Sequence, residues 1–343
     1  MTYVYPGGAP NTHVQSFEAT QSLIVSFSRN PDKFQLPRYV KYVPVENQTD
    51  LYLQLDFDNP VRVIGDGEDS IWPDGDDAPS GADTNDGFVW KSYIAQRHAQ
   101  PFRMGNIAAQ QADWDIIATQ GHSAASRAMT LRTKKVLDLL TNSGNYGGNT
   151  DSATDLGGGL WGAATSSNLY IKKALMAAVS AIVKATNAAV QMKDLLLVLS
   201  PDLAMAMSET DEIHNYTKSS PAAEIVLEGQ DRRDNFGLPR FLYGLETCVE
   251  DAVLNSNKKG AASQTKNYIM PENDAIIVSR PGGLEGVLGL SSFSTVSLFF
   301  VEELNTETKA DEWNRVTRGR VTDNYDVQMT AAPAGYLITN TLS

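Results

Sequence analysis

The sequence predicts an α+β protein, and three stretches lead to this class. Residues 51–58, "LYLQLDFD", alternate apolar and more polar side chains with the two-residue period of a β-strand. Residues 106–140 repeat small and apolar side chains at three- and four-residue steps, which predicts a helix ~50 Å long if it is unbroken. Short apolar runs then predict mostly strands, at 224–228, 240–254, 274–280 and 295–303 and in a closing pair around "TAAPA".

Residues 1–50 are predicted to form an extended arm. Prolines at positions 6, 10, 31, 37 and 44 prevent long helices in this part of the chain. The strand at 51–58 then begins a β-hairpin, whose outgoing strand continues to residue 63 and whose return covers 88–94. The acid-rich stretch between these strands is therefore the long tip of the hairpin.

Three helices and a buried strand are predicted in the middle of the chain. The first helix covers 106–140, with Gly121 as its weak point, and the glycine-rich run after it ends it. The second begins from a cap at 166–168 and continues to Val190 with a more apolar face. "LLLVL" at 195–199 predicts a buried strand, after which Ser200 caps a further helix with Pro201 at its first position.

Composition and charge limit the function. A hydrophobic content of 42% excludes disorder throughout, and 343 residues suit about two domains. The formal net charge is −13, and residues 51–100 contribute −7 of it, from ten acids against three bases. This balance disfavours sequence-specific nucleic-acid binding and binding to an anionic membrane. The single cysteine and the lack of a signal peptide predict a chain that is cytoplasmic when made.

The acidic tip does not fit a known metal loop. An EF-hand that begins at Asp74 would have Ala78 at its fifth position, and one that begins at Asp83 would have Gly87 there. A calcium ion at the tip remains an open alternative. A solvated or partner-bound loop is the favoured interpretation.

No catalytic constellation stands out, so no catalytic residue and no cofactor is expected. The four histidines lack metal-ligand spacing, and "GGGLWG" at 157–162 follows a polar linker rather than the strand that a nucleotide loop needs. Cys248 is expected to be a small buried hydrophobe. "RVTRGR" at 315–320 is the densest basic cluster, either a solvated loop or a dock for carboxylates.

Three stretches resemble the major capsid proteins of tailed bacteriophages, the Hong Kong 97-type fold family. "DLLLVLSPDLAMAMSET" at 194–210 is similar to the family's strand and following helix. "LYGLETCVEDAV" at 242–253 resembles the glycine turn and strand of its axial domain, with Glu246 where the family usually has proline. "DNYDVQMTAAPAGYLITN" at 323–340 resembles its closing strand pair, with the bend at Pro333 and Ala334.

The resemblance implies a division of the chain and a structural, non-enzymatic role. It implies an N-terminal arm and first strand at 1–52, an extended loop at 53–103, a peripheral domain with a long spine helix at 104–165, an axial domain at 166–303 and a return to the peripheral domain at 304–343. The expected partners are copies of the chain in pentamers and hexamers, with cement, portal and separate scaffold proteins. Packaged double-stranded DNA would be contacted non-specifically. The expected locations are the virion and, during assembly, the host cytoplasm.

Three alternatives remain open at this point. An encapsulin-like compartment would have the same fold and would hold an enzyme as cargo. An α/β enzyme with an acidic lid loop, or a calcium-dependent binding module, would belong to a different class.

The candidate site residues are those expected at contacts between subunits. Acids crowded in the tip repel one another and need cations from elsewhere, and guanidinium groups pair best with carboxylates. The predicted contact residues are Asp66, Glu68, Asp69, Asp74, Asp76 and Asp77 of the tip, the aromatic residues Trp72, Phe88 and Trp90, and the bases Arg315, Arg318 and Arg320.

Overall fold

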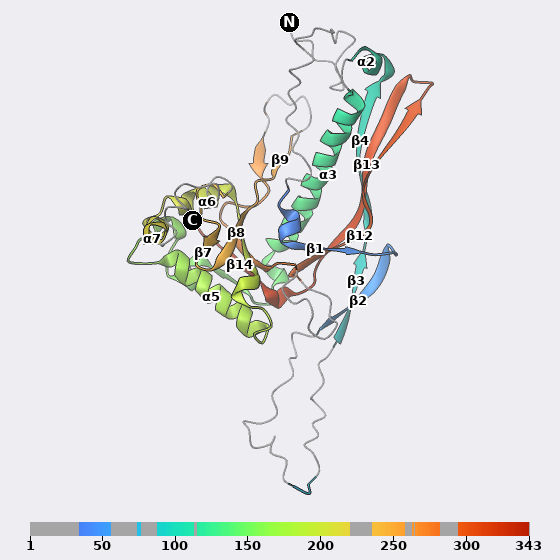
Figure 1. Cartoon of the computed structure of the whole chain (residues 1–343). Helices are drawn as coiled ribbons and strands as arrows, with labels where there is room; N and C mark the ends of the chain where they lie inside the picture. Colours follow the sequence, from blue (N-terminus) through green and yellow to red (C-terminus); the bar gives the residue numbers. More distant parts are fainter. Residues whose placement is uncertain are drawn as a thin grey trace.

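A computed structural model describes residues 34–55, 74–76, 88–112, 115–219, 235–257, 263, 265–281 and 294–342. The chain is elongated, with a long helix and sheet along one side and a helix-covered sheet on the other (Figure 1). In the described part of the chain, no helix is long and apolar enough to cross a bilayer. The predicted strand at 224–228 and the outward continuation through Val61 and Val63 lie outside the described residues.

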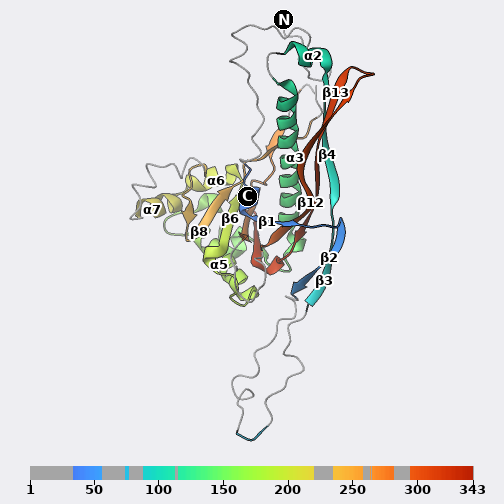
Figure 2. The same cartoon turned by 45° about the vertical axis from the view of Figure 1, so that its right-hand side comes forward.

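A four-stranded sheet forms one side of the molecule. Its order is β1-β12-β13-β4, made of Val40–Pro44, Val296–Asp311, Val316–Met329 and Gln96–Gly105. β12 and β13 form a long antiparallel hairpin, and β1 lies parallel to β12. The long helix α3, Ile116–Leu140, lies along this sheet (Figure 2), with small residues such as Ala124 and Ala128 against Phe102 and Val321.

The predicted single helix over 106–140 was wrong, because the chain forms two helices there. α2 covers Asn106–Gln111, Ala112 is extended, and the side chain of Asp115 caps α3 by accepting a hydrogen bond from Ala118 N at 2.9 Å. The helix is not interrupted at Gly121, which lies buried inside α3. Asp115 satisfies a backbone N–H of the first turn, and this fixes the start of the second helix.

A six-stranded sheet forms the other side. Its order is β5-β14-β11-β6-β8-β7, made of Thr150–Ser152, Gly335–Thr339, Ala275–Ser279, Leu195–Leu199, Leu245–Val249 and Phe241–Leu242. One face packs against α5, α6 and α7, which cover Tyr170–Ala185, Pro201–Ser208 and Asp211–Ser219. The other face packs against the end of α3 and the segment around Leu36 and Tyr39. Strands buried on both faces explain why "LLLVL" is apolar throughout.

The start of α5 differs from the prediction. The helix begins at Tyr170, and its N-cap position is Leu169 in the left-handed region, without a side-chain cap from 166–168. Glu212 of α7 caps it instead, by accepting hydrogen bonds from Ile171 N and Lys172 N at 3.1 and 2.8 Å. A carboxylate held in place by another helix satisfies these N–H groups, so no local cap is needed. The predicted cap at Ser200, in contrast, is present and accepts from Leu203 N.

The two closing segments are strands, but they do not pair with each other. Residues 325–329 end β13 in the four-stranded sheet, whereas β14 lies between β5 and β11 in the six-stranded sheet. The turn η6, Ala332–Ala334, connects the two sheets. The remaining short elements are α4 at Ala153–Gly157, the ribbon β9–β10 at Val253–Asn255 and Lys266–Tyr268, and the 3-10 turns Leu36–Arg38, Ser143–Asn145, Trp161–Ala163 and Met192–Asp194.

The predicted β-hairpin is confirmed at its base. β2, Thr49–Leu55, pairs antiparallel with β3, Phe88–Ile94, and Leu53 lies opposite Trp90. One face of this ribbon rests on the four-stranded sheet, where Tyr93 stacks on Phe299 with ring centroids 4.8 Å apart. The base of the arm is therefore held by aromatic packing.

Candidate assembly surfaces

The outward face of the β2–β3 ribbon is apolar and exposed. Leu51, Leu53, Trp90 and Ile94 are on the face opposite to Tyr93, and they remain 49–65% exposed. Four large apolar side chains on one projecting ribbon are typical of a surface that another protein covers. Trp90 is on this face, and its contact with a neighbouring subunit stays a prediction; the side chain of Phe88 lies outside the described part.

Most of the acidic tip also lies outside the described residues, including Asp66, Glu68, Asp69, Trp72 and Asp77. Asp74, Gly75 and Asp76 are described and form an exposed turn. Gly75 has φ +92°, a left-handed conformation that favours glycine. The predicted contacts of the tip remain predictions.

The three predicted arginines lie on the projecting β12–β13 hairpin. Arg315 is in the turn at φ +50°, and Arg318 and Arg320 are in β13. Arg318 forms an ion pair with Asp311 at 2.9 Å, and Arg320 forms one with Glu307 at 2.6 Å. Half-exposed pairs of this kind contribute about 0–1 kcal/mol each. Both guanidinium groups can therefore also pair with a carboxylate of another subunit.

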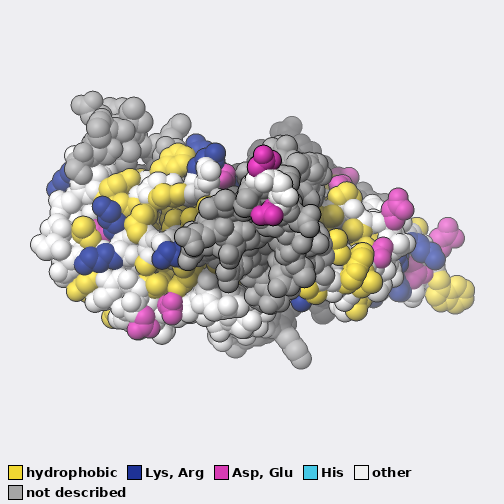
Figure 3. All heavy atoms as spheres, turned by 90° about the horizontal axis from the view of Figure 1, so that it is seen from below, with side chains coloured by type: hydrophobic (Ala, Val, Ile, Leu, Met, Phe, Trp, Pro, Cys, Tyr) yellow, Lys and Arg dark blue, Asp and Glu magenta, His cyan; other side chains and the backbone are white. Residues whose placement is uncertain are grey.

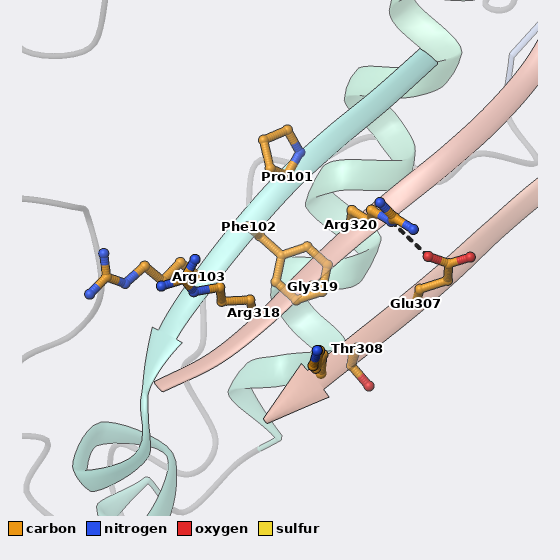
Figure 4. A pocket seen from close by; sticks show the side chains of 9 residues that line it. Pro101, Phe102, Arg103, Glu307, Thr308, Arg318, Gly319 and Arg320 are labelled. Carbon is orange, nitrogen blue, oxygen red and sulfur yellow. Dashed lines mark hydrogen bonds and ion pairs between the residues drawn. The ribbon is translucent and has the colours of Figure 1, made fainter. Parts of the chain in front are cut away.

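A groove of about 790 Å³ is formed by β4, β12 and β13 (Figure 4). The strand register brings Arg103, Arg318 and Lys309 into one row across the three strands. Like charges directly opposite each other in a sheet are destabilising, so this row favours an anionic partner. The ring of Phe102 fills the space above Gly319, where an added Cβ would lie 2.1 Å from the Phe102 Cζ atom.

Trp313 is at the turn of the same hairpin, and 95% of its surface is exposed. The turn is ordered by Asp311, whose two carboxylate oxygens accept hydrogen bonds from the backbone and side-chain amides of Asn314. The hairpin therefore presents a large aromatic side chain on a fixed support.

One basic cluster in the described structure was not predicted from the sequence. Arg38, Arg240 and Arg280 converge on the carboxylate of Glu246, with the first two at 3.1 and 3.3 Å and Arg280 also bonded to it. Only 9% of the Glu246 side chain is exposed. The three arginines are far apart in sequence, and the only local signal was the acid at a position where the resembling family has proline.

A buried ion pair fixes α3 on its sheet. Arg132 of α3 donates to both carboxylate oxygens of Asp323 in β13, from Nε at 3.0 Å and from Nη2 at 2.6 Å. The rings of Tyr42 and Tyr325 lie 5.6 and 5.2 Å from the guanidinium carbon. This bidentate geometry sets the position of the helix along the strand.

Cys248 and His98, two of the residues considered for catalysis or metal binding, are packed among other side chains. Cys248 is fully buried, and burial raises the pKa of its thiol to about 12, with Arg38 and nearby acids as the charged groups that act on it. His98 contacts Lys135, and burial lowers the pKa of this histidine. In the ranges that the structure describes, no three His, Cys, Asp or Glu side chains could together hold a metal ion.

The underside of the molecule shows lysine and arginine side chains mixed with apolar ones over the region of α5 (Figure 3). Lys172, Lys173 and Lys184 are the exposed bases of that helix, and Met176 and Val183 are partly exposed between them. The exposed face of α5, like the outward face of β2–β3, is therefore partly apolar.

Comparison with known proteins gives a result for structure only. No protein-family profile and no curated protein sequence matches the chain. Among solved structures, the capsid of cyanophage P-SCSP1u matches with a TM-score of 0.62 at 8% identity, over 96% of this chain and 94% of that chain. The mature capsid of bacteriophage PhiM1 matches with a TM-score of 0.58 at 11% identity, over 95% and 91%. A phage-related protein from Bordetella bronchiseptica matches with a TM-score of 0.55 at 14% identity, over 88% and 90%.

The matches to the two phage capsids span nearly the whole chain in both directions. The chain therefore has the Hong Kong 97-type fold found in tailed-bacteriophage capsid structures.

Proposed function

We propose that the chain is the major shell subunit of a tailed bacteriophage, and that its copies assemble into a closed icosahedral head around double-stranded DNA. The observation that carries this proposal is the apolar outward face of β2–β3, which projects from a fold shared with phage capsids. Ordering a projecting arm costs about 1–2 kcal/mol per residue, and contacts with neighbouring copies would offset that cost. The subunit would work in the virion after assembly in the host cytoplasm.

The predicted division of the chain is part of this proposal. Residues 53–103 would extend over a neighbouring subunit, 104–165 would form the peripheral domain around α3, and 166–303 would form the axial domain at the five- and six-fold vertices. The two sheets support two such halves but not the bounds between them. β12 is in the four-stranded sheet from Val296, inside 166–303, and β14, inside the predicted return at 304–343, is in the six-stranded sheet.

The acidic tip would pair with arginines of a neighbouring β12–β13 hairpin. Asp74 and Asp76 are exposed, and the groove at Arg318 contains more bases than acids among its lining residues. A carboxylate from a neighbour would relieve the repulsion within the row of Arg103, Arg318 and Lys309. Repetition at every contact of a closed shell multiplies a small pairwise energy.

Electron microscopy of the purified protein tests the main proposal. Closed shells of uniform size are expected, and particles from infected cells should contain nuclease-protected double-stranded DNA. A soluble monomer at every concentration would contradict the proposal, and shells that contain a bound enzyme would identify a cargo compartment instead.

Charge reversal tests the tip contact. Arg318→Glu with Arg320→Glu should impair assembly and leave the circular dichroism of the subunit unchanged, because both side chains are more than half exposed. A base introduced at Asp74 or Asp76 should restore part of the assembly. Normal assembly of the reversed variant at both low and high salt would rule out this contact.

A further inference from the structure

A basic patch with an aromatic centre lies at the β7 end of the six-stranded sheet. Arg38, Arg240 and Arg280 share the single carboxylate of Glu246, so two of the three positive charges have no acid within this group. Their side chains are 37%, 55% and 39% exposed, against 9% for Glu246. Glu246 therefore forms the floor, and the three guanidinium groups form a rim with free N–H donors.

Phe241 completes this basic patch. It is 53% exposed, and the Arg240 guanidinium carbon lies 5.6 Å from its ring centroid. Phe241 pairs with Glu246 across β7 and β8, so both side chains are on the same face of the sheet. That face is opposite to the one covered by α5, α6 and α7, because neighbouring Leu245 packs into the core beneath those helices.

The outward face of α6 has the opposite character. Leu203, Ala204 and Met207 point into the core, which leaves Asp202, Met205 and Glu209 on the outer side at three- and four-residue steps. Met205 is 41% exposed and lies between the two acids. Glu209 is at the C-cap of α6, two residues before α7 begins at Asp211, and its side chain is exposed.

The two surfaces are complementary in charge and share an apolar centre. One has an exposed phenylalanine among arginines, and the other has an exposed methionine between acids. They are on opposite faces of the same sheet, so contact within one chain is excluded and contact between copies is head-to-tail. A rotation that closes such a contact generates a ring.

We propose that the basic patch of one copy, Arg38, Arg240, Phe241 and Arg280, docks onto the α6 face of the next copy, Asp202, Met205 and Glu209, and that this contact joins copies into rings. The inference rests on the proposed shell function and deepens it, because it names the contact around each vertex. A buried aromatic and sulfur contact supplies the centre, and charge pairs at the rim fix the register.

Disulfide trapping tests this contact directly. Met205→Cys and Phe241→Cys are placed in one chain, assembled and oxidised with copper phenanthroline, then separated on a denaturing gel. A ladder of covalent oligomers up to the ring size is expected, and a mixture of the two single variants should give dimers only. The natural Cys248 does not interfere, because it is fully buried.

A matched control uses Ser180→Cys, exposed on α5, together with Phe241→Cys, and it should give no ladder. Shells that form normally but give no ladder from the Met205 and Phe241 pair would overturn the ring contact and leave the shell function intact. Absence of shells from the unmodified protein would instead contradict the proposed function.

Charge exchange gives a second measurement. Asp202→Lys with Glu209→Lys should raise the protein concentration needed for assembly by ~tenfold or more, since like charges would face each other. Adding Arg240→Glu should recover part of that loss. No change in the first variant, or no recovery in the second, would count against the pairing of these two surfaces.

Discussion

Removing one partner of the buried Arg132–Asp323 pair should strongly destabilise the subunit. Arg132→Met leaves the Asp323 carboxylate, whose side chain is only 2% exposed, without either of its guanidinium hydrogen bonds. A buried charge left without its partner costs about 3–5 kcal/mol. The cation–π contacts with Tyr42 and Tyr325 are lost as well, at about 0.5–2 kcal/mol each.

The double variant Arg132→Met with Asp323→Leu separates the interaction energy of the pair from the effects of the two single substitutions. Because it removes both charges from the interior, it should cost ~0–2 kcal/mol, less than the single Arg132 change. Urea unfolding followed by circular dichroism, on subunits kept dilute enough to stay unassembled, gives each free energy of unfolding. If the double variant lost as much as the two single variants summed, the two residues would not be coupled and the proposed anchoring of α3 would be refuted.

Further predictions concern the packing at Gly319, the dependence of stability on pH, and DNA binding. Gly319→Val should lower the unfolding free energy by about 1–3 kcal/mol, because its Cβ would overlap the Phe102 ring, and Phe102→Leu should recover part of it, as thermal unfolding would show. Burial and the Lys135 ammonium 2.7 Å away lower the pKa of His98 from its ordinary value of about 6.5. Because the fold favours the neutral ring, the contribution of His98 to the free energy of unfolding is fully present above about pH 6.5 and is lost as the pH falls toward the folded pKa. On acidification through this range, the urea midpoint should therefore fall less in His98→Gln than in the unmodified protein. Unassembled subunits, with a net charge of −13, should not shift a DNA probe at physiological salt, and a nanomolar specific complex would contradict the structural role.

Local patterns in the sequence determined the elements whose causes are themselves local. Alternation at 51–58 predicted the β2–β3 ribbon, and "LLLVLSP" predicted both β6 and the Ser200 cap of α6, because pleat, burial and capping act over a few residues. The break before α3 also has a local signal, because Asp115 is a preferred N-cap residue type, although the apolar repeat continues across it.

Only the tertiary structure decided which distant side chains meet. The Glu212 cap of α5, the separation of β13 and β14 into two sheets, and the convergence of Arg38, Arg240 and Arg280 on Glu246 all join residues from different parts of the chain. The sequence showed "RVTRGR" as the densest run of bases, but folding pairs Arg318 and Arg320 with acids across the same hairpin. Charge density along a chain differs from charge density on a surface, because strand pairing and packing rather than sequence neighbours set the distances between charged groups.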